Sequence, residues 1–473
     1  MLVRRVSILL GLWSIVAGCG NARPSVPDAA PDQTCVVHEE FQAHVNRKLD
    51  LLFVVDDSPA MANMEAKLAR ELPAFMPALV DATTNKFDNL HVGIVSSSLG
   101  GGRFTDVPGC EAGGAGDRGG RLSHPADAGL AAGETFMRLN GVPLNFQGDA
   151  GTVFSRLAQV GHAGCPYPQP LEAARRALTK AHDPTDPDNG GFLRDDAQLA
   201  VVIISNGDDC SVPASSDLFD PGQTRFADPY GATGPYRCAE FGWLCGGAPP
   251  PHQLPGGVEQ LALDMCEPAG ASGKLTPVAE FSAFLKGLKV NPDYVLVSVI
   301  AGPKDPVLVA RTTDDGAPAL AASCMTALGG EMATPAIRLA AFADTFDANG
   351  IRYPTCANFL AGALGGVAER IHVKFGTSCL VRAPTLTSAG LPNCRVTEVN
   401  RDENDVVTRW DLSACDADRS ILPCWTVDTT ATYCLQGVPF RVCLDEACSP
   451  PRAYGGGDVA FDISCQVACG QGL

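Results

Sequence analysis

Runs of consecutive apolar residues, separated by segments with helical periodicity, dominate the first three quarters of the chain. The run from Leu49 to Val55 holds six apolar residues in seven, which is typical of a strand covered on both faces, as in a parallel sheet. Similar runs occupy 91–96, 199–204 and 294–300. Each of these runs predicts a buried strand.

Between the runs, apolar residues recur at steps of three and four, which predicts helices. One such stripe extends from Met61 to Leu79, and Pro73 and Pro77 should kink or end its helix early. Further helices are predicted over 153–160, 171–180, 278–288, 337–346 and 357–371.

Strands that alternate with helices predict an α/β domain with a doubly wound, mostly parallel, Rossmann-like sheet. This domain should cover residues 45–372, with long loop insertions at about 100–150 and 211–275. At about His372 the pattern changes to short alternating segments, such as Val406–Trp410 and Phe440–Leu444, between Gly, Pro, Asp and Cys residues. We therefore predict a small Cys-rich β module over 373–473.

The N-terminal segment predicts export. Arg4 and Arg5 precede an apolar run from Val6 to Ala17, too short to span a bilayer well, which is typical of a secretory signal. The ending Val16-Ala17-Gly18-Cys19 resembles a bacterial lipobox, which implies that Cys19 carries a lipid anchor in the membrane; an ordinary signal peptide is the alternative. Residues 20–44 should then form a flexible tether. Gly20 favours the outer membrane, because the Asp that often signals inner-membrane retention is absent.

Cysteine content agrees with export. With Cys19 set aside, 18 cysteines remain, which in an oxidising compartment suggests up to nine disulfides of unknown pairing. The candidates are Cys35, Cys110, Cys165, Cys210, Cys238, Cys245, Cys266, Cys324, Cys356, Cys379, Cys394, Cys415, Cys424, Cys434, Cys443, Cys448, Cys465 and Cys469.

Net charge excludes one class of partner. The chain of 473 residues has a formal net charge of -18 and no basic run. Because phosphate binding needs clustered Lys and Arg, we expect no nucleic acid among its partners. An acidic surface is compatible with divalent cations.

Candidate chemistry lies where the first buried run ends, at Asp56-Asp57-Ser58-Pro59. Asp56 and Ser58 lie two residues apart at the carboxyl end of a strand, where open α/β sheets bind ligands. Their oxygens favour a hard cation such as Mg²⁺ or Ca²⁺. The alternative is a capped helix start, with Asp57 or Ser58 as N-cap and Pro59 just inside. A later run ends similarly, in Ser205-Asn206-Gly207-Asp208-Asp209-Cys210.

The order of strand, Asp56-Asp57-Ser58-Pro59-Ala60-Met61 and long helix resembles the opening of a von Willebrand factor type A domain. This resemblance implies a metal-ion-dependent adhesion site, built from Asp-x-Ser-x-Ser, a Thr in a later loop and an Asp before Gly, whose open coordination position takes an acidic group of the ligand. Asp56 and Ser58 match the first two positions, and Asn206 stands where the Asp is usual.

The remaining positions of that site are lost. Ala60 replaces the second Ser, and the loop that should bring the Thr has Tyr167 as its only hydroxyl before Pro168. Asp208 and Asp209 follow two and three residues after Asn206 as substitute ligands. We therefore expect a degenerate Mg²⁺ or Ca²⁺ site formed by Asp56, Ser58, Asn206 and Asp208.

Three short segments are similar to Cys-rich, lipid-anchored type A domains of predatory soil bacteria: Asp208-Asp209-Cys210, Gln169–Ala174 and Tyr353–Cys356.

A separate polar segment, Asp183 to Asn189, has two prolines and lacks the Glu of a calcium loop, so we predict a solvated acidic turn.

Catalytic motifs are absent from the sequence. The eight histidines form no His-Glu-x-x-His, and no Gly-x-Ser-x-Gly follows a strand. A Ser-His-Asp set assembled from distant segments stays open, but we expect no enzyme. The expected function is a cell-envelope lipoprotein whose domain binds a protein or cell-surface ligand in adhesion; the alternative is a structural or assembly component without metal-dependent binding.

Overall fold

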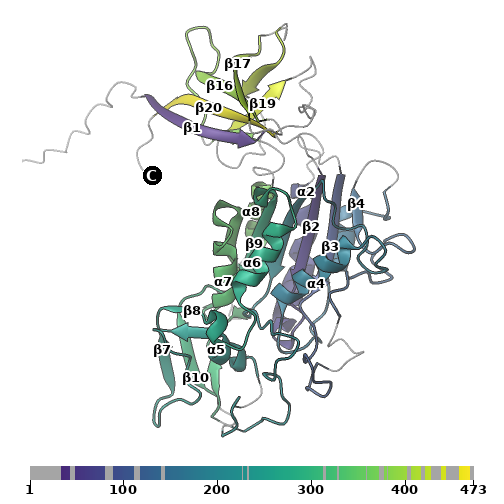
Figure 1. Ribbon diagram of the computed structural model, residues 1–473, viewed down its shortest axis with the longest axis vertical. Coiled ribbons are helices and arrows are strands. Elements are labelled where there is room, and N and C mark those ends of the chain that lie inside the picture. The colour runs from purple at the N-terminus through teal and green to yellow at the C-terminus, as the bar shows by residue number, and fades with distance from the viewer. Residues whose placement is uncertain are drawn as a thin grey trace, which may run out of the picture.

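The computed structural model describes residues 34–42, 48–79, 89–110, 118–139, 144–225, 227–231, 234–312, 316–327, 330–357, 360–371, 378–380, 382–401, 406–416, 421–427, 438–443 and 458–468. The signal and Cys19 lie outside this set, as do Cys434, Cys448 and Cys469. Figure 1 shows a large α/β part with a β module above it.

A six-stranded sheet forms the centre of the α/β part, with strand order β14-β9-β5-β2-β3-β4. Neighbouring strands are parallel, except that β4 runs antiparallel to β3 at one edge. The strands are β2 (Lys48–Val55), β3 (Asn89–Ser96), β4 (Met137–Leu139), β5 (Gln198–Ile204), β9 (Val295–Ala301) and β14 (Gly350–Pro354). The apolar runs correspond to β2, β3, β5 and β9, whereas the short edge strands β4 and β14 were not predicted.

Helices cover both faces of this sheet (Figure 1). One face carries α1 (Ala62–Glu71), α2 (Phe75–Leu79), α3 (Ala150–Ala158) and α8 (Leu360–Ile371). The other carries α4 (Pro170–His182), α6 (Val278–Gly287) and α7 (Ile337–Asp344). The predicted helices are therefore confirmed.

Strand β2 contributes to the hydrophobic cores on both faces of the sheet, because its side chains point alternately to the two faces. Phe53 packs on the first face, where its ring centroid lies 5.2 Å from that of Phe75 and 4.9 Å from that of Phe154. Leu52 and Val54 pack on the second face. A strand with two buried faces needs apolar residues at nearly every position, which explains the unbroken run.

The helical stripe over 61–79 is divided, as the prolines predict. A 3₁₀ turn η1 (Pro59–Met61) precedes α1, and a second turn η2 (Leu72–Ala74) separates α1 from α2. Pro73 lies inside η2, while Pro77 lies in the first turn of α2, where its missing N–H costs no hydrogen bond.

The predicted insertion over 211–275 is more ordered than its sequence indicates. It contains α5 (Tyr236–Gly242), β6 (Trp243–Cys245), β7 (Gln260–Leu263), β8 (Cys266–Pro268) and η3 (Gly270–Ser272). Two segments after β9 complete the sheet of β7, and these are β10 (Val307–Arg311) and β11 (Pro318–Leu320). A separate two-stranded sheet is formed by β12 (Cys324–Met325) and β13 (Met332–Ala333). Two further 3₁₀ turns are η4 (Pro292–Tyr294) and η5 (Asp347–Asn349). Pairing of β7 with β10 depends on residues far apart in sequence, so no local pattern predicts it.

The C-terminal module is a seven-stranded sheet with order β1-β20-β16-β17-β18-β19-β15. Its strands are β1 (Thr34–Gln42), β15 (Ser378–Leu380), β16 (Cys394–Arg401), β17 (Val407–Ala414), β18 (Cys424–Val427), β19 (Val438–Cys443) and β20 (Asp458–Ala468). The prediction of a tether over 20–44 is wrong for 34–42, because these residues pair with β20 along the whole of β1.

Six disulfides join described cysteines, in agreement with an oxidising compartment. They are Cys110–Cys165, Cys210–Cys238, Cys245–Cys266, Cys324–Cys356, Cys394–Cys465 and Cys415–Cys424. Cys35 is also disulfide-bonded.

None of the described helices is long and apolar enough to cross a membrane.

Candidate binding site at the carboxyl edge of the sheet

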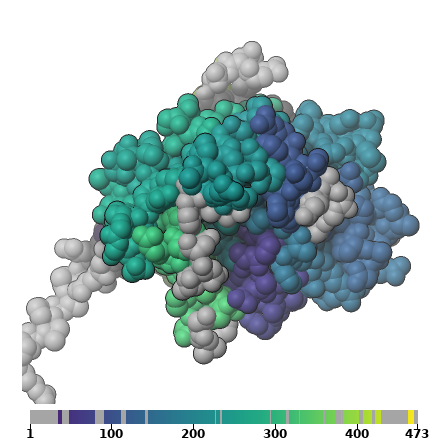
Figure 2. Space-filling model, turned by 90° about the horizontal axis from the view of Figure 1, so that it is seen from below, coloured from purple at the N-terminus to yellow at the C-terminus, as the bar shows by residue number. Residues whose placement is uncertain are grey.

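The loops that follow β2, β3 and β5 lie at one edge of the sheet, and the predicted site residues are in the loops after β2 and β5. These loops, together with the insertion, form what we call the rim. Figure 2 views this side of the molecule from below and shows the teal insertion over part of it, beside blue segments. A separate apolar cluster, which includes the Cys110–Cys165 and Cys210–Cys238 disulfides, joins the insertion to the loop after β3.

Asp56 lies at the centre of a hydroxyl cluster. Its Oδ2 accepts a 2.6 Å hydrogen bond from Ser205, and its Oδ1 accepts bonds from the Ser58 backbone N–H at 2.8 Å and the Ser97 hydroxyl at 3.3 Å. Burial raises the pKa of Asp56, and hydrogen bonds from Ser205, Ser58 and Ser97 oppose that rise. Both carboxylate oxygens are therefore already used within the protein.

Ser97 and Ser205 were not predicted as site residues. Each follows a buried strand directly, and backbone hydrogen bonds from Ser97 to Val55 and from Ser205 to Ile300 tie the strand ends together. The alignment of parallel strand ends is what brings these hydroxyls to Asp56, and strand order cannot be obtained from a local pattern.

Ser58 occupies the N-cap position of η1 with Pro59 directly after it, as the capped-turn alternative predicts. Its side chain makes no capping hydrogen bond. The turn is held instead by Asp56, which accepts from the Ser58 N–H.

Asp57 points to the other side of the turn and is fully buried. Its Oδ2 accepts a 3.1 Å ion-pair hydrogen bond from Arg118 Nε, and Arg118 Nη2 donates to the Val160 carbonyl at 2.9 Å. Burial raises the pKa of Asp57 to about 6, against opposing contributions from Ser96 and Arg118. An arginine thus lies directly beside the Asp56–Ser58 turn, which the sequence did not indicate.

Asn206 fastens the loop after β5 to the turn after β2. Its side-chain Nδ2 donates a 2.6 Å hydrogen bond to the Ala60 carbonyl, and its backbone carbonyl accepts from the Thr334 N–H at 2.9 Å. The carboxamide therefore joins two loops.

Asp208, the possible substitute ligand, is directed at α7 instead. Its carboxylate accepts hydrogen bonds from the N–H groups of Arg338 and Leu339 in the first turn of α7, and from Trp243 Nε1 at 2.9 Å. Burial raises the pKa of Asp208 to about 6, although these bonds oppose the rise. Carboxylates at helix N-termini are stabilised by the helix dipole, so Asp208 has a complete structural role.

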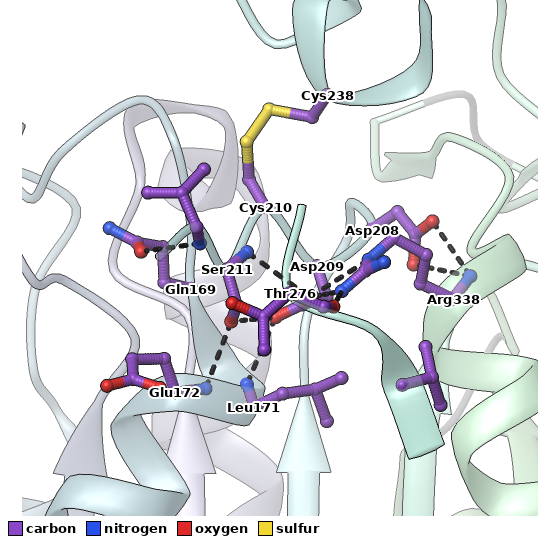
Figure 3. Close-up of polar contacts among 12 residues, drawn as sticks. Gln169, Leu171, Glu172, Asp208, Asp209, Cys210, Ser211, Cys238, Thr276 and Arg338 are labelled. Carbon is purple, nitrogen blue, oxygen red and sulfur yellow. Dashed lines mark hydrogen bonds and ion pairs between the residues drawn. A yellow bond between two sulfur atoms is a disulfide. The ribbon is translucent and has the colours of Figure 1, made fainter. Parts of the chain in front are cut away.

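Asp209 connects three elements, as Figure 3 shows. Its Oδ2 accepts from Arg338 Nε and Nη2 at 3.1 and 2.9 Å, and both side chains are almost fully buried. Its Oδ1 accepts from the Leu171 N–H at the start of α4 and from the Ser211 hydroxyl. The next residue, Cys210, is bonded to Cys238 in α5.

Tyr167 does not approach the Asp56 cluster. Its ring stacks on Phe219 of the insertion with centroids 4.5 Å apart, and its hydroxyl oxygen accepts from the Gly234 N–H. Burial raises the pKa of Tyr167.

As a donor set for a hard cation, these residues are poor. Asp56 is the one carboxylate in the hydroxyl cluster, and the neighbouring Asp57 is paired with the Arg118 guanidinium. Affinity for Mg²⁺ or Ca²⁺ depends on ligand charge, and a fixed cation beside the site opposes it. Within the described ranges, no three His, Cys, Asp or Glu side chains are grouped to hold a metal ion.

No protein-family model and no curated protein sequence matches the chain. Among solved structures, the pilus adhesin SpaC from Lactobacillus rhamnosus GG, in its open conformation, is 12% identical with a TM-score of 0.32, over 92% of this chain and 40% of the adhesin. The human COPII-coat protein Sec24c is 9% identical with a TM-score of 0.29, over 91% of this chain and 42% of Sec24c. The chain spans about two fifths of the length of these structures, and at such TM-scores neither likeness bears on function.

Proposed function

We propose that this protein is a lipid-anchored cell-envelope scaffold whose von Willebrand factor type A-like domain binds a protein or cell-surface partner through the rim, without a metal ion. The observation that carries the proposal is the bracing of the rim. Its polar side chains are bonded to one another across loops, and its longest loops are joined by disulfides. A surface held in this way suits recognition, because less conformational entropy is lost on binding.

The type A resemblance supports the kind of domain. The Asp-x-Ser turn follows a buried central strand of a largely parallel sheet, and a helix follows the turn. Loops at the carboxyl ends of parallel strands are the usual ligand-binding positions of such sheets.

Location rests on the lipobox and the disulfides. Cys19 would hold the chain at the membrane, with the outer membrane favoured by Gly20. We propose no catalytic role, since Asp56, Asp57, Asp208 and Asp209 each accept hydrogen bonds that hold the rim together. The rival proposal, a structural or assembly component without a discrete ligand, places partner contacts in the C-terminal module instead.

Calorimetric titration with Mg²⁺, Mn²⁺ and Ca²⁺ tests the metal-free part of the proposal. The full-length protein, stripped of metal with a chelator and held in neutral detergent, should give no saturable heat at millimolar metal, because Asp56 already accepts three hydrogen bonds. The matched control is Asp56→Asn, which keeps the side-chain shape. Saturable heat in the wild type that Asp56→Asn abolishes would establish a metal site and overturn this part.

Binding of the purified protein to intact envelopes separates the two functional proposals. Rim binding predicts that substitutions of exposed rim residues weaken retention, whereas removal of the C-terminal module leaves it in place. The reverse outcome supports the assembly component.

A further inference from the structure

Beside the Asp56–Ser58 turn, the rim contains a cleft of about 640 Å³. Its polar lining residues are Ser96, Arg118, Arg121, Ser123, His124 and Gln159. We call this the cationic cleft, because it is lined by two arginines and by no carboxylate among the described residues. Each arginine is held by an ion pair at its Nε, Arg118 with Asp57 and Arg121 with Asp188.

Both arginines retain donors for a ligand. Arg118 uses Nε for Asp57 and Nη2 for the Val160 carbonyl, while Nη1 has no partner among the described residues. Arg121 is paired through Nε with Asp188 at 3.3 Å, and its side chain is 66% exposed. A guanidinium presents its donors as a planar fork that matches a carboxylate, so each arginine can bind one oxyanion while its carboxylate partner holds it in place.

His124 adds a third polar group. Its Nδ1 lies 2.8 Å from the Leu122 carbonyl oxygen, which can only accept, so Nδ1 carries the proton. Nε2 is then the ring nitrogen left for a ligand. Apolar lining comes from Leu122, Pro125 and Val160, of which Pro125 is partly exposed and can contact the aliphatic parts of a bound chain.

The segment that carries these residues is held in position from several sides. The Arg118 N–H donates to the Ser98 carbonyl, and the Ser123 N–H donates to the Ile94 carbonyl of β3. Asn189 is fully buried, although we predicted a solvated turn there, and its side chain accepts from the Leu122 N–H and donates to the Gly120 carbonyl. The cleft is therefore built before any ligand arrives.

Gly120 shows how tightly this segment packs. Its φ is +71°, and a Cβ added there would lie 2.6 Å from the Cβ of Arg176 on α4. Only glycine fits both the backbone conformation and the space.

We propose that the cationic cleft binds an acidic peptide segment of the partner, with carboxylates paired to Arg118 and Arg121. This inference rests on the proposed rim-binding function. The cleft is larger than one small anion needs, and its apolar lining favours a peptide over a bare ion. Because Asp57 and Asp188 already balance the charges of the two arginines, selection of a carboxylate comes from the remaining guanidinium N–H groups, which can only donate.

Fluorescence anisotropy tests the proposal on the full-length protein in neutral detergent. The probe is a labelled Gly-Asp-Gly-Asp-Gly peptide with blocked ends, and the same peptide with Asn in place of Asp is its control. We expect saturable binding of the Asp peptide only, weaker at higher salt, with Arg121→Gln reducing affinity about tenfold through loss of a charged hydrogen bond. Arg121→Glu should abolish binding.

Arg70→Gln is the matched protein control. Arg70 is 62% exposed and paired with Glu71, as Arg121 is exposed and paired, but it does not line the cleft. It should leave peptide affinity unchanged. Because Arg121 is exposed, its variants should fold, and circular dichroism checks this.

Equal binding of the Asp and Asn peptides, or no effect of Arg121→Gln, would overturn the proposal. So would absence of binding of the Asp peptide, whether or not the cleft takes inorganic phosphate as a small-anion site. If the Asp peptide does not bind but substitutions elsewhere in the rim still weaken binding to envelopes, the ligand assigned to the cleft is wrong and the proposed function stands. If no rim substitution affects envelope binding, the proposed function fails whatever the peptide does.

Discussion

Asp56 and Asp57 are adjacent in sequence and differ in what surrounds them. Asp56 faces hydroxyl donors, and Asp57 faces a guanidinium on the other side of the turn. The two aspartates thus have different roles, because each has a different set of neighbours. A motif reduced to Asp-x-Ser does not contain this information.

Asp57 should make stability depend on pH. Burial raises its pKa from 3.8 to about 6, so between these values the folded protein holds a proton that the unfolded chain has lost. Its stabilising contribution is complete below about pH 4 and is lost as the pH rises through about 6. The loss is on the order of 3 kcal/mol.

Asp57→Asn should therefore lessen the decline of unfolding free energy between pH 4 and 7 by on the order of 3 kcal/mol, measured by denaturant titration at each pH. The part of the decline that Asp208 causes should remain. The amide oxygen of the variant can still accept from Arg118. Asp344→Asn, at an exposed side chain, is the control and should follow the wild-type profile. Parallel profiles for the wild type and Asp57→Asn would show that Asp57 is not the group responsible.

At the scale of elements, the loop after β5 connects three helices. Consecutive residues hold α7 through Asp208, α4 and α7 through Asp209, and α5 through Cys210. The acidic residues that looked like metal ligands in sequence are used to fasten helices. Helix N-termini and buried arginines attract carboxylates as readily as a cation does.

Removal of Asp209 should be costly. Asp209→Ala leaves the buried Arg338 guanidinium without its partner, and breaking a buried pair in this way costs about 3–5 kcal/mol of unfolding free energy. Asp344→Ala, which breaks the exposed pair with Arg352, should cost at most about 1 kcal/mol. Chemical denaturation of both variants measures the difference, and similar losses in the two would contradict a special role for Asp209.

At the scale of the whole molecule, the first and the last described segments of the chain pair in one sheet. Strand β1 lies at the edge of the C-terminal module and pairs with β20 over nine residues, from Thr34↔Ala468 to Gln42↔Ala460. In Figure 1 this module lies above the α/β part, and the insertion lies at the opposite, lower end. The module is therefore complete only when residues from before the α/β part are present.

Deletion of 34–42 should loosen the module and spare the α/β part. Without β1, the outer hydrogen bonds of β20 are exposed to water, so amides of β20 should exchange faster while those of β2 and β5 keep their protection. Hydrogen exchange followed by mass spectrometry measures both. A chain lacking only 20–33 is the control and should exchange as the wild type does; equal protection of β20 in the two deletions would show that β1 is dispensable.

The sequence by itself determined the buried strands, the main helices and the change of pattern near residue 372. Each of these depends on local periodicity: β2 is apolar at nearly every position because both its faces are covered, and the helix after it divides at Pro73. It also singled out Asp56 and Ser58 as the turn at the end of a central strand.

Only the tertiary structure decided what the polar groups contact. Asn206 reaches Ala60, Arg118 reaches Asp57, and β1 reaches β20, in each case across long stretches of chain. Such pairings depend on strand order and loop packing, which no window of sequence contains. The cationic cleft, assembled from β3, the loop that follows it and the end of α3, belongs to this second class.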